Sequence, residues 1–173
     1  KKLTVGAAIG TNTEDLDRAR SLISNGVDLI VIDTAHGHSK KVLQTLLKIK
    51  KITKNTPVCV GNIATREAAK KLYDSGADII KVGIGPGSIC TTRMVAGIGV
   101  PQISAIMEVK EALNKKNIKI ISDGGIKFSG DIAKALAAGA DAIMMGSIFA
   151  GTDESPGKKF KINGKFYKQY RGM

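Results

Sequence analysis

The fold is decided by a motif that occurs three times, and its middle copy reads Ser75-Gly76-Ala77-Asp78-Ile79-Ile80-Lys81-Val82. In this motif the glycine ends a helix in the left-handed conformation, and the apolar run after it has the composition of a buried strand. The other two copies are Asn25-Gly26-Val27-Asp28 and Ala138-Gly139-Ala140-Asp141. Each copy therefore predicts a joint that leads from a helix into a strand.

Six apolar runs along the chain predict strands, and segments of helical period separate them. The runs cover residues 3–9, 28–33, 57–61, 78–83, 119–123 and 142–146. Residues suited to cap the intervening helices are Thr13, Thr65, Ser104 and Ser129. Continuous apolar strands that alternate with helices indicate a parallel sheet covered on both faces. A doubly wound sheet and a (βα)8 barrel both satisfy this pattern.

The position of the polar motifs favours the barrel, because each motif directly follows a predicted strand. These motifs are Asp33-Thr34, Gly61-Asn62, residues 83–90, Asp123-Gly124-Gly125 and Gly146-Ser147. The carboxyl ends of all strands converge on one mouth in a barrel, whereas in an open sheet only the loops at the switch point converge. About six βα units are present where a barrel has eight. We therefore predict an α/β fold, a partial TIM barrel over residues 1–157.

A different pattern follows residue 157. Two short runs, 159–162 and 165–168, flank Asn163-Gly164, which is typical of a hairpin with a type I′ turn. We expect residues 158–173 to form the start of a mobile flap that breaks off at Met173. Because the chain starts at Lys1 without a methionine and holds too few barrel units, we expect it to be an internal piece of a longer enzyme.

Composition argues against several classes of protein. No apolar run approaches the roughly 20 residues that a membrane span needs. The net charge is +12, but the lysines are spread over the predicted helix surfaces and aromatic residues make up only 4%, which argues against a nucleic-acid partner. The two cysteines, Cys59 and Cys90, lie in different contexts, which fits a reducing cytoplasm better than a disulfide framework.

The candidate nucleophile is Cys90, at the end of the loop Gly83-Ile84-Gly85-Pro86-Gly87-Ser88-Ile89-Cys90. Alternate glycines leave a backbone that can present its amides or carbonyls to a ligand. Local amide dipoles lower the pKa of a cysteine and favour the nucleophilic thiolate. Cys59 instead lies within an apolar run, which predicts a buried structural thiol.

Two glycine loops that follow the last two predicted strands indicate an anion site. The loops Asp123-Gly124-Gly125 and Gly146-Ser147 would present unpaired N–H groups beside helix N-termini, where phosphate is favoured. Asp123 would then accept hydrogen bonds from ribose hydroxyls. The alternative is that these glycines only form tight βα turns.

The segment after the second predicted strand is less specific. Asp33 is either a ligand contact at the mouth or a cap of its loop. His36 and His38 have no third ligand near them in the sequence, so they support neither a zinc site nor a Cys–His pair with Cys90.

At these motifs the chain resembles the family of inosine-5′-monophosphate (IMP) dehydrogenases and guanosine-monophosphate (GMP) reductases, over essentially its whole length. The motifs that carry the resemblance are Gly6-Ala7-Ala8-Ile9-Gly10, Asp33-Thr34-Ala35-His36-Gly37-His38, Gly61-Asn62, residues 83–92, Asp123-Gly124-Gly125-Ile126, Met144-Met145-Gly146-Ser147 and Tyr170-Arg171-Gly172-Met173. The reductases share the loop around Cys90 but typically have asparagine at the position of His36, and they lack the Tyr-Arg-Gly-Met form. Those differences favour the dehydrogenase.

The resemblance implies NAD-dependent oxidation of IMP to xanthosine 5′-monophosphate (XMP) through a covalent thioimidate on Cys90, in the biosynthesis of guanine nucleotides. The implied catalytic residues are Cys90 and Thr92. The implied substrate-binding residues are Ser88, Asp123, Gly124, Gly125, Gly146, Ser147, Tyr170, Arg171, Gly172 and Met173. The implied cofactor-binding residues are Asp33, Thr34, Ala35, Asn62, Gly83, Ile84 and Gly85. The carbonyls of Gly85, Gly87 and Cys90 resemble a potassium site, which suits a hard cation.

The resemblance also implies a cytoplasmic homotetramer, and parts of that enzyme are missing from this chain. They are the first two barrel units, a regulatory module before Lys1, and an arginine-tyrosine pair after Met173 whose arginine is the family's base for hydrolysis. We therefore expect these residues to be incomplete for catalysis. The alternatives are a GMP reductase and a non-catalytic binder of phosphate ligands or nucleic acid.

Overall fold

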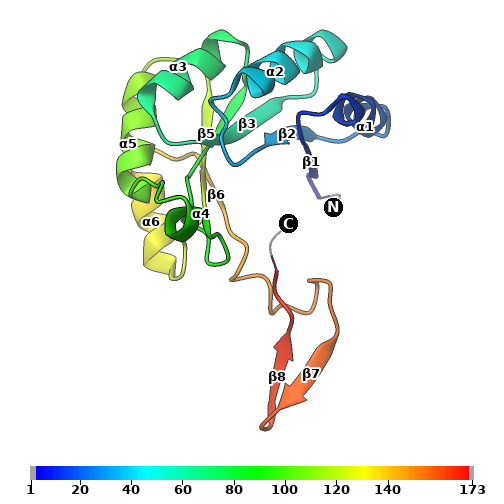
Figure 1. Cartoon of the computed structure of the whole chain (residues 1–173), viewed down its shortest axis with the longest axis vertical. Helices are drawn as coiled ribbons and strands as arrows, with labels where there is room; N and C mark the ends of the chain where they lie inside the picture. The colour runs from blue at the N-terminus through cyan, green and yellow to red at the C-terminus, as the bar shows by residue number, and fades with distance from the viewer. Residues whose placement is uncertain (1–2, 172–173) are drawn as a thin grey trace.

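Six parallel strands lie side by side in chain order and form one curved sheet (Figure 1). The structure, a computed structural model, describes residues 3–171. The strands are β1 Gly6–Ile9, β2 Leu29–Asp33, β3 Val58–Ile63, β4 Ile79–Val82, β5 Lys119–Asp123 and β6 Ala142–Met144. Because the order from β1 to β6 never reverses, every crossover advances the sheet in one direction, as in a barrel and unlike a doubly wound sheet. The prediction of a partial TIM barrel is confirmed.

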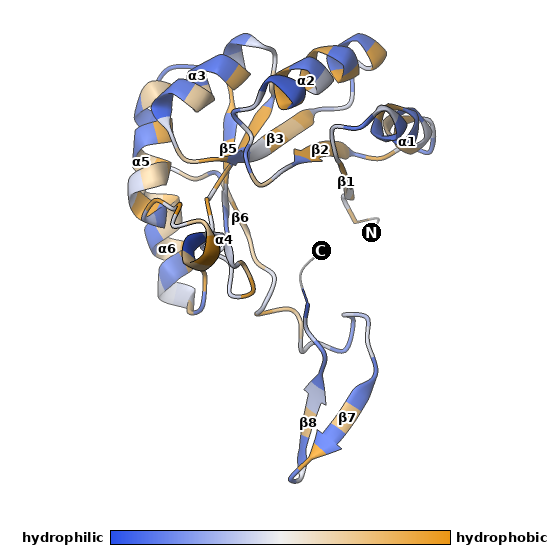
Figure 2. Ribbon diagram, in the orientation of Figure 1, coloured by the Kyte–Doolittle hydropathy of each residue, from blue (hydrophilic) through white to orange (hydrophobic). Residues whose placement is uncertain are grey.

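The helices lie along the outer side of the sheet, apart from the short α4 (Figure 1). They are α1 Thr13–Ser24, α2 Lys40–Ile52, α3 Arg66–Asp74, α4 Thr92–Val95, α5 Gln102–Ala112 and α6 Ser129–Ala137. Hydrophilic residues cover the outward faces of α2 and α3 (Figure 2). Among residues 3–171, no helix is both long enough and apolar enough to cross a membrane.

The main core lies between the sheet and these outer helices. Its largest fully buried apolar side chains are Ile30, Ile32, Leu46, Ile49, Leu72, Ile80, Ile106, Ile120, Val42, Val58 and Val60. Successive side chains of a strand point to opposite faces, so the residues that alternate with this set face the interior of the barrel. The strand register places Asp33, Gly61, Lys81, Ile121 and Ala142 in one such interior row. The row lies at the carboxyl end of β2 and near that of β4, and it crosses the middle of β5 and the start of β6.

Strand boundaries agree with the predictions to within one residue for β2, β4 and β5, and they differ by two or three residues at one end of β1, β3 and β6. β5 has the predicted bounds, whereas β1 begins at Gly6 instead of residue 3 and β6 ends at Met144 instead of residue 146. The backbone N–H of Val5 donates to Asp28 Oδ2 at 2.8 Å, so a side chain takes the place of a ladder partner there.

Of the four predicted helix caps, one is confirmed: Thr65 precedes α3 and its Oγ1 accepts from the N–H of Ala68 at 3.3 Å. The other three predictions are wrong. Thr13 and Ser129 are the first residues of α1 and α6, because a carboxylate three residues beyond the cap satisfies the free N–H groups: Asp15 accepts from the N–H of Asn12, and Asp131 from that of Phe128.

Ser104 lies inside α5, which begins at Gln102 directly after Pro101. Proline has no N–H to satisfy and its fixed φ suits a helix start. The helix therefore starts three residues earlier than a cap at Ser104 predicts, directly after the proline.

Beyond the sheet, the chain forms the predicted hairpin, which projects away from the helices and strands (Figure 1). Strands β7 Lys159–Ile162 and β8 Lys165–Lys168 pair antiparallel, and Asn163 and Gly164 both have positive φ, 48° and 79°. Positive φ at both central residues defines the predicted type I′ turn.

Candidate active site

A cavity of about 360 Å³ opens at the carboxyl ends of the strands, and we call it the mouth cavity. Its lining residues are Asp33, Lys81, Pro86, Gly87, Ser88, Asp123, Gly124, Gly125, Ile126, Lys127, Met144, Met145, Gly146, Ser147 and Tyr170. This volume lies in the range of small-molecule sites. The cavity thus brings together seven of the ten residues of the predicted nucleotide site, from four separate segments of the chain.

The two glycine loops are shaped by close backbone approach. Gly124 has φ of 86°, and a Cβ there would lie 3.1 Å from the backbone nitrogen of Gly87. The loop after β5 therefore packs directly on the loop after β4. A Cβ on Gly146 would lie 2.7 Å from the hydroxyl of Tyr170, so this tyrosine from beyond the hairpin sits against the loop after β6. Larger residues at either glycine would separate the loops that line the mouth cavity.

The Cys90 side chain is exposed beside the mouth cavity but does not line it, whereas its neighbour Ser88 does. Cys90 Sγ lies 3.3 Å from Thr92 Oγ1, a hydrogen-bond distance for sulfur. Hydrogen bonds from the Thr92 hydroxyl and backbone N–H, with a smaller contribution from the Arg93 charge, hold the pKa of Cys90 below its ordinary value. A lowered pKa increases the fraction of reactive thiolate at neutral pH.

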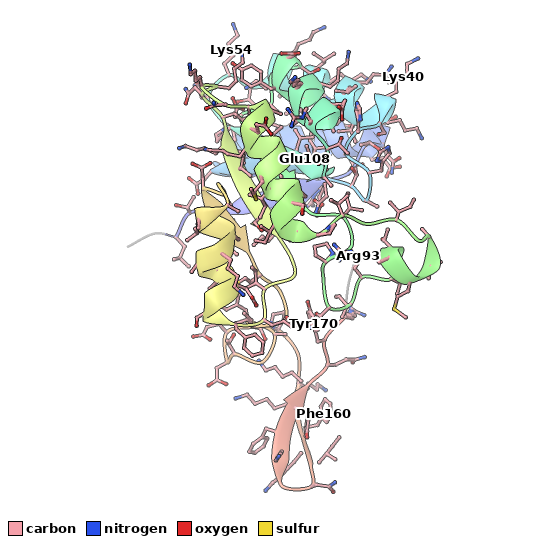
Figure 3. The ribbon with its side chains drawn as sticks, turned by 90° about the vertical axis from the view of Figure 1, so that its left-hand side faces the viewer. Lys40, Lys54, Arg93, Glu108, Phe160 and Tyr170 are labelled. Carbon is pink, nitrogen blue, oxygen red and sulfur yellow. The ribbon has the colours of Figure 1, made fainter. Side chains whose placement is uncertain are left out.

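Arg93, which was not predicted from the sequence, forms a hydrogen bond to the loop that carries Cys90. Its Nε donates to the carbonyl of Ile84 at 3.0 Å and its Nη2 to the carbonyl of Val100 at 2.7 Å. The side chain thus lies between the glycine-rich loop and the segment that leads into α5 (Figure 3). A Cβ on Gly85 would lie 2.7 Å from Arg93 Cγ, so the glycine is needed for this close approach.

Lys81 is the second residue that the sequence reasoning missed. Its side chain is only 2% exposed, and its Nζ donates to Asp33 Oδ1 at 3.0 Å and to Asp123 Oδ2 at 2.6 Å. The amide of Asn62 donates to the same Asp123 oxygen and to the carbonyl of Gly83, both at 2.9 Å. Only glycine fits at position 61, because a Cβ there would lie 2.7 Å from Lys81 Cβ.

Burial and the two carboxylates shift the pKa of Lys81 in opposite directions. Burial is the largest single effect and lowers its pKa, but the charges and hydrogen bonds of Asp123 and Asp33 together outweigh it, so the pKa is raised above its ordinary value. Lys81 is therefore a cation at neutral pH. A signal for it was present in the sequence: a lysine interrupts the otherwise apolar strand at Ile79-Ile80-Lys81-Val82.

The remaining predicted residues lie around the mouth cavity without lining it. Thr34 Oγ1 donates to the carbonyl of Gly61 at 2.9 Å, and Ala35 is exposed. Arg171 lines a neighbouring cavity of about 700 Å³ at the base of the hairpin, which shares Gly146 and Tyr170 with the mouth cavity. Gly172 and Met173 fall outside the described residues.

His36 and His38 are both exposed, with ring centroids 6.5 Å apart. Within residues 3–171, no group of three or more His, Cys, Asp or Glu side chains is arranged to hold a metal ion. A cation at the Cys90 loop would have to bind backbone oxygens of residues such as Gly85 and Gly87.

Comparison with known proteins agrees with this architecture. The family model described as "IMP dehydrogenase / GMP reductase domain" matches residues 1–173. The chain is 58% identical over 172 residues to a protein of Aquifex aeolicus, covering 99% of this chain and 35% of that protein. It is 56% identical over 174 residues to one of Methanocaldococcus jannaschii (99% and 35%) and 58% identical over 172 residues to one of Cryptosporidium parvum (99% and 42%).

All three relatives are named inosine-5′-monophosphate dehydrogenase. The chain spans well under half the length of each of them. Because the family model matches its whole length, the chain belongs to the IMP dehydrogenase/GMP reductase family.

Proposed function

We propose that the protein carrying this chain oxidises IMP to XMP, with NAD as the hydride acceptor and Cys90 as the nucleophile. The observation that carries the proposal is the setting of Cys90. Its thiol is exposed, its pKa is lowered, and its loop forms one wall of a cavity that also contains Asp123 and two glycine loops. A carboxylate and glycine amides are the groups that a ribose phosphate requires.

In the proposed substrate site, the phosphate binds the amides of Gly125, Gly146 and Ser147, with Ser88 and Tyr170 contributing hydroxyls. Asp123 accepts hydrogen bonds from the ribose hydroxyls. Arg171, Gly172 and Met173 complete the site around the base, beside Gly124. The close packing of Gly124 on the loop of Gly87 supports a single continuous site for phosphate and base.

The chemistry assigned to Cys90 is nucleophilic catalysis. The thiolate attacks C2 of the hypoxanthine ring, a carbon–sulfur bond forms, and the hydrogen at C2 departs as hydride. Water then attacks the thioimidate, the carbon–sulfur bond breaks, and the products are XMP, NADH and a proton. Thr92 holds the thiolate by the hydrogen bond at 3.3 Å, which supports its role beside the reacting centre.

NAD would supply the acceptor for the hydride, held on the side of the mouth formed by Asp33, Thr34, Ala35, Asn62, Gly83, Ile84 and Gly85. The residues fit a polar ligand, because Asn62 Oδ1 is buried without a hydrogen-bond partner in the described chain. A buried acceptor without a partner is costly and points to a donor that binds there.

Potassium would be held by the carbonyls of Gly85, Gly87 and Cys90 and would fix the shape of the loop. The loop fits such a cation, because Gly85 has φ of 71° and a Cβ there would collide with Arg93. Carbonyl oxygens are suitable ligands for a hard cation, and glycines leave them unobstructed. We also propose that residues 1–157 form the catalytic barrel, that residues 158–173 begin a mobile flap, and that the enzyme is a cytoplasmic homotetramer.

The test uses the intact protein with IMP, NAD and potassium. The proposal predicts NADH absorbance that depends on both substrates and rises with potassium. NADPH-dependent release of ammonia from GMP, without NADH formation from IMP, would identify a reductase instead. That alternative belongs to the same family, but the relatives reported above are all named dehydrogenases.

A further inference from the structure

One buried lysine contacts two carboxylates that the proposed function assigns to different ligands. Lys81 Nζ donates to Asp123 Oδ2, on the nucleotide side, and to Asp33 Oδ1, on the cofactor side. The two aspartates end strands β2 and β5, which are not neighbours in the sheet. Lys81 therefore joins two halves of the mouth that no backbone ladder joins directly.

Each of the two carboxylates has one oxygen that contacts Lys81 and one that forms no hydrogen bond within residues 3–171. Among residues 3–171, the hydrogen bonds to these side chains fall on Asp123 Oδ2 and Asp33 Oδ1, and none is formed to Asp123 Oδ1 or Asp33 Oδ2. Both side chains line the mouth cavity and are partly exposed, 23% for Asp123 and 32% for Asp33. The lysine thus holds one oxygen of each carboxylate and leaves the other able to accept a hydrogen bond from a ligand in the cavity.

The charge of Lys81 also offsets the charges of the two carboxylates that line the mouth cavity. The titratable groups that face Lys81 are Asp33 from β2, Asp123 from β5 and Cys59 from β3, and Cys59 is a neutral buried thiol. Removal of the lysine charge would leave two carboxylates in the mouth cavity, with Lys127 as the remaining lysine in its lining. Breaking a buried ion pair by deleting one partner is costly because the other charge stays behind without compensation.

We propose that Lys81 is a positioning residue that couples the nucleotide site to the cofactor site through Asp123 and Asp33, a role that rests on the proposed function. It orients both carboxylates, and it offsets their mutual repulsion in the presence of an anionic ligand. The two sites consequently share one cation, and a change at either carboxylate alters binding at the other.

The experiment measures IMP and NAD binding to the intact protein by calorimetry at neutral pH and fixed ionic strength. The variants are Lys81→Met, Lys81→Arg and the matched control Lys50→Met, which removes a lysine paired with Asp78 outside the mouth cavity. Lys81→Met should weaken the binding of both IMP and NAD by about tenfold or more, and Lys50→Met should change either affinity by less than about twofold. Lys81→Arg keeps the charge and should bind both ligands more tightly than Lys81→Met.

A second pair of variants separates coupling from packing. In the coupled arrangement, Lys81→Met with Asp33→Asn removes one of the two uncompensated carboxylates, so the double variant should bind IMP about threefold or more tighter than Lys81→Met alone. A lysine that only fills space predicts no such recovery. Asp33→Asn by itself should tighten IMP binding, since Lys81 then forms an ion pair with Asp123 alone.

Unchanged IMP and NAD binding in Lys81→Met overturns the inference while the proposed function stands, as does a double variant no better than Lys81→Met. If Lys81→Met does not fold, as judged by circular dichroism, Asp33→Asn alone decides: IMP binding equal to or weaker than wild type overturns the inference. Absence of IMP binding by the wild-type protein contradicts the proposed function and this inference with it.

Discussion

The interior of β3 and the loop after β4 each hold one of the two cysteines, and their surroundings act on the thiols in opposite directions. Cys59 is fully buried on the barrel side of β3, where burial raises its pKa to about 12. Cys90 is exposed on the glycine-rich loop, where hydrogen bonds from Thr92 lower its pKa. The surroundings therefore favour the protonated thiol at Cys59 and the thiolate at Cys90. The difference arises from solvent access and from two local donors, not from a histidine base.

The largest expected difference between the two cysteines is in turnover, when each thiol is removed in turn. In the intact protein, Cys90→Ala should reduce turnover of IMP at least about a thousandfold, because no other group nearby replaces the nucleophile. Cys59→Ala is the matched control and should change turnover by less than about threefold. Steady-state NADH formation checks both. Turnover that persists in Cys90→Ala would refute covalent catalysis.

Alkylation compares the two thiols within one molecule. At neutral pH, iodoacetamide should modify Cys90 at least about a hundredfold faster than Cys59, because the thiolate is the reacting species and Cys59 is both buried and protonated. Peptide mass spectrometry after timed quenching gives both rates. Denaturant should abolish the difference by exposing Cys59. Similar rates in the folded protein would show that the environments do not differ as described.

The burial of Cys59 is tested by changing its polarity. Cys59→Ser places a hydroxyl at a fully buried position and should reduce the free energy of unfolding by about 1–3 kcal/mol. Urea unfolding followed by circular dichroism measures the change. The same substitution at the exposed Cys90 should alter stability by less than about 0.5 kcal/mol. Equal effects at the two positions would contradict the burial of Cys59.

The smallest expected effect concerns the donor that sets Cys90 apart. Thr92→Val removes the hydroxyl but keeps the backbone N–H, so the pKa of Cys90 should rise part of the way to its ordinary value. Alkylation at neutral pH should slow by about three- to tenfold, since one hydrogen bond to the thiolate is lost. The pH at which the rate is half maximal should move upward. An unchanged pH profile would mean that the Thr92 hydroxyl does not stabilise the thiolate.

Much of this contrast could be predicted from the sequence, because it follows from local patterns. The apolar run around Cys59 predicts a buried thiol, and the glycine-rich loop before Cys90 predicts an exposed one. The structure confirms both predictions: Cys59 is buried and Cys90 is exposed. The repeated helix-to-strand joints likewise predict the parallel sheet, since each joint needs only a few consecutive residues.

The roles of Lys81 and Arg93 could not be predicted in the same way. Lys81 is buried only because Asp33 and Asp123 reach it from other strands, and that meeting depends on the register of the sheet. Arg93 binds the carbonyls of Ile84 and Val100, and backbone acceptors leave no signature in the identity of the residues that supply them. Sequence patterns report a residue's own neighbours, whereas these contacts join distant segments.

The most direct test of the proposed function is a search for the covalent intermediate on Cys90. The intact protein is mixed with IMP, NAD and potassium, quenched in acid during turnover and digested, and the cysteine peptides are analysed by mass spectrometry. A nucleotide adduct is expected on the peptide that contains Cys90, where it should be absent without NAD, and no adduct is expected on the peptide that contains Cys59. Steady turnover of IMP with an unmodified Cys90 peptide would contradict the proposed function.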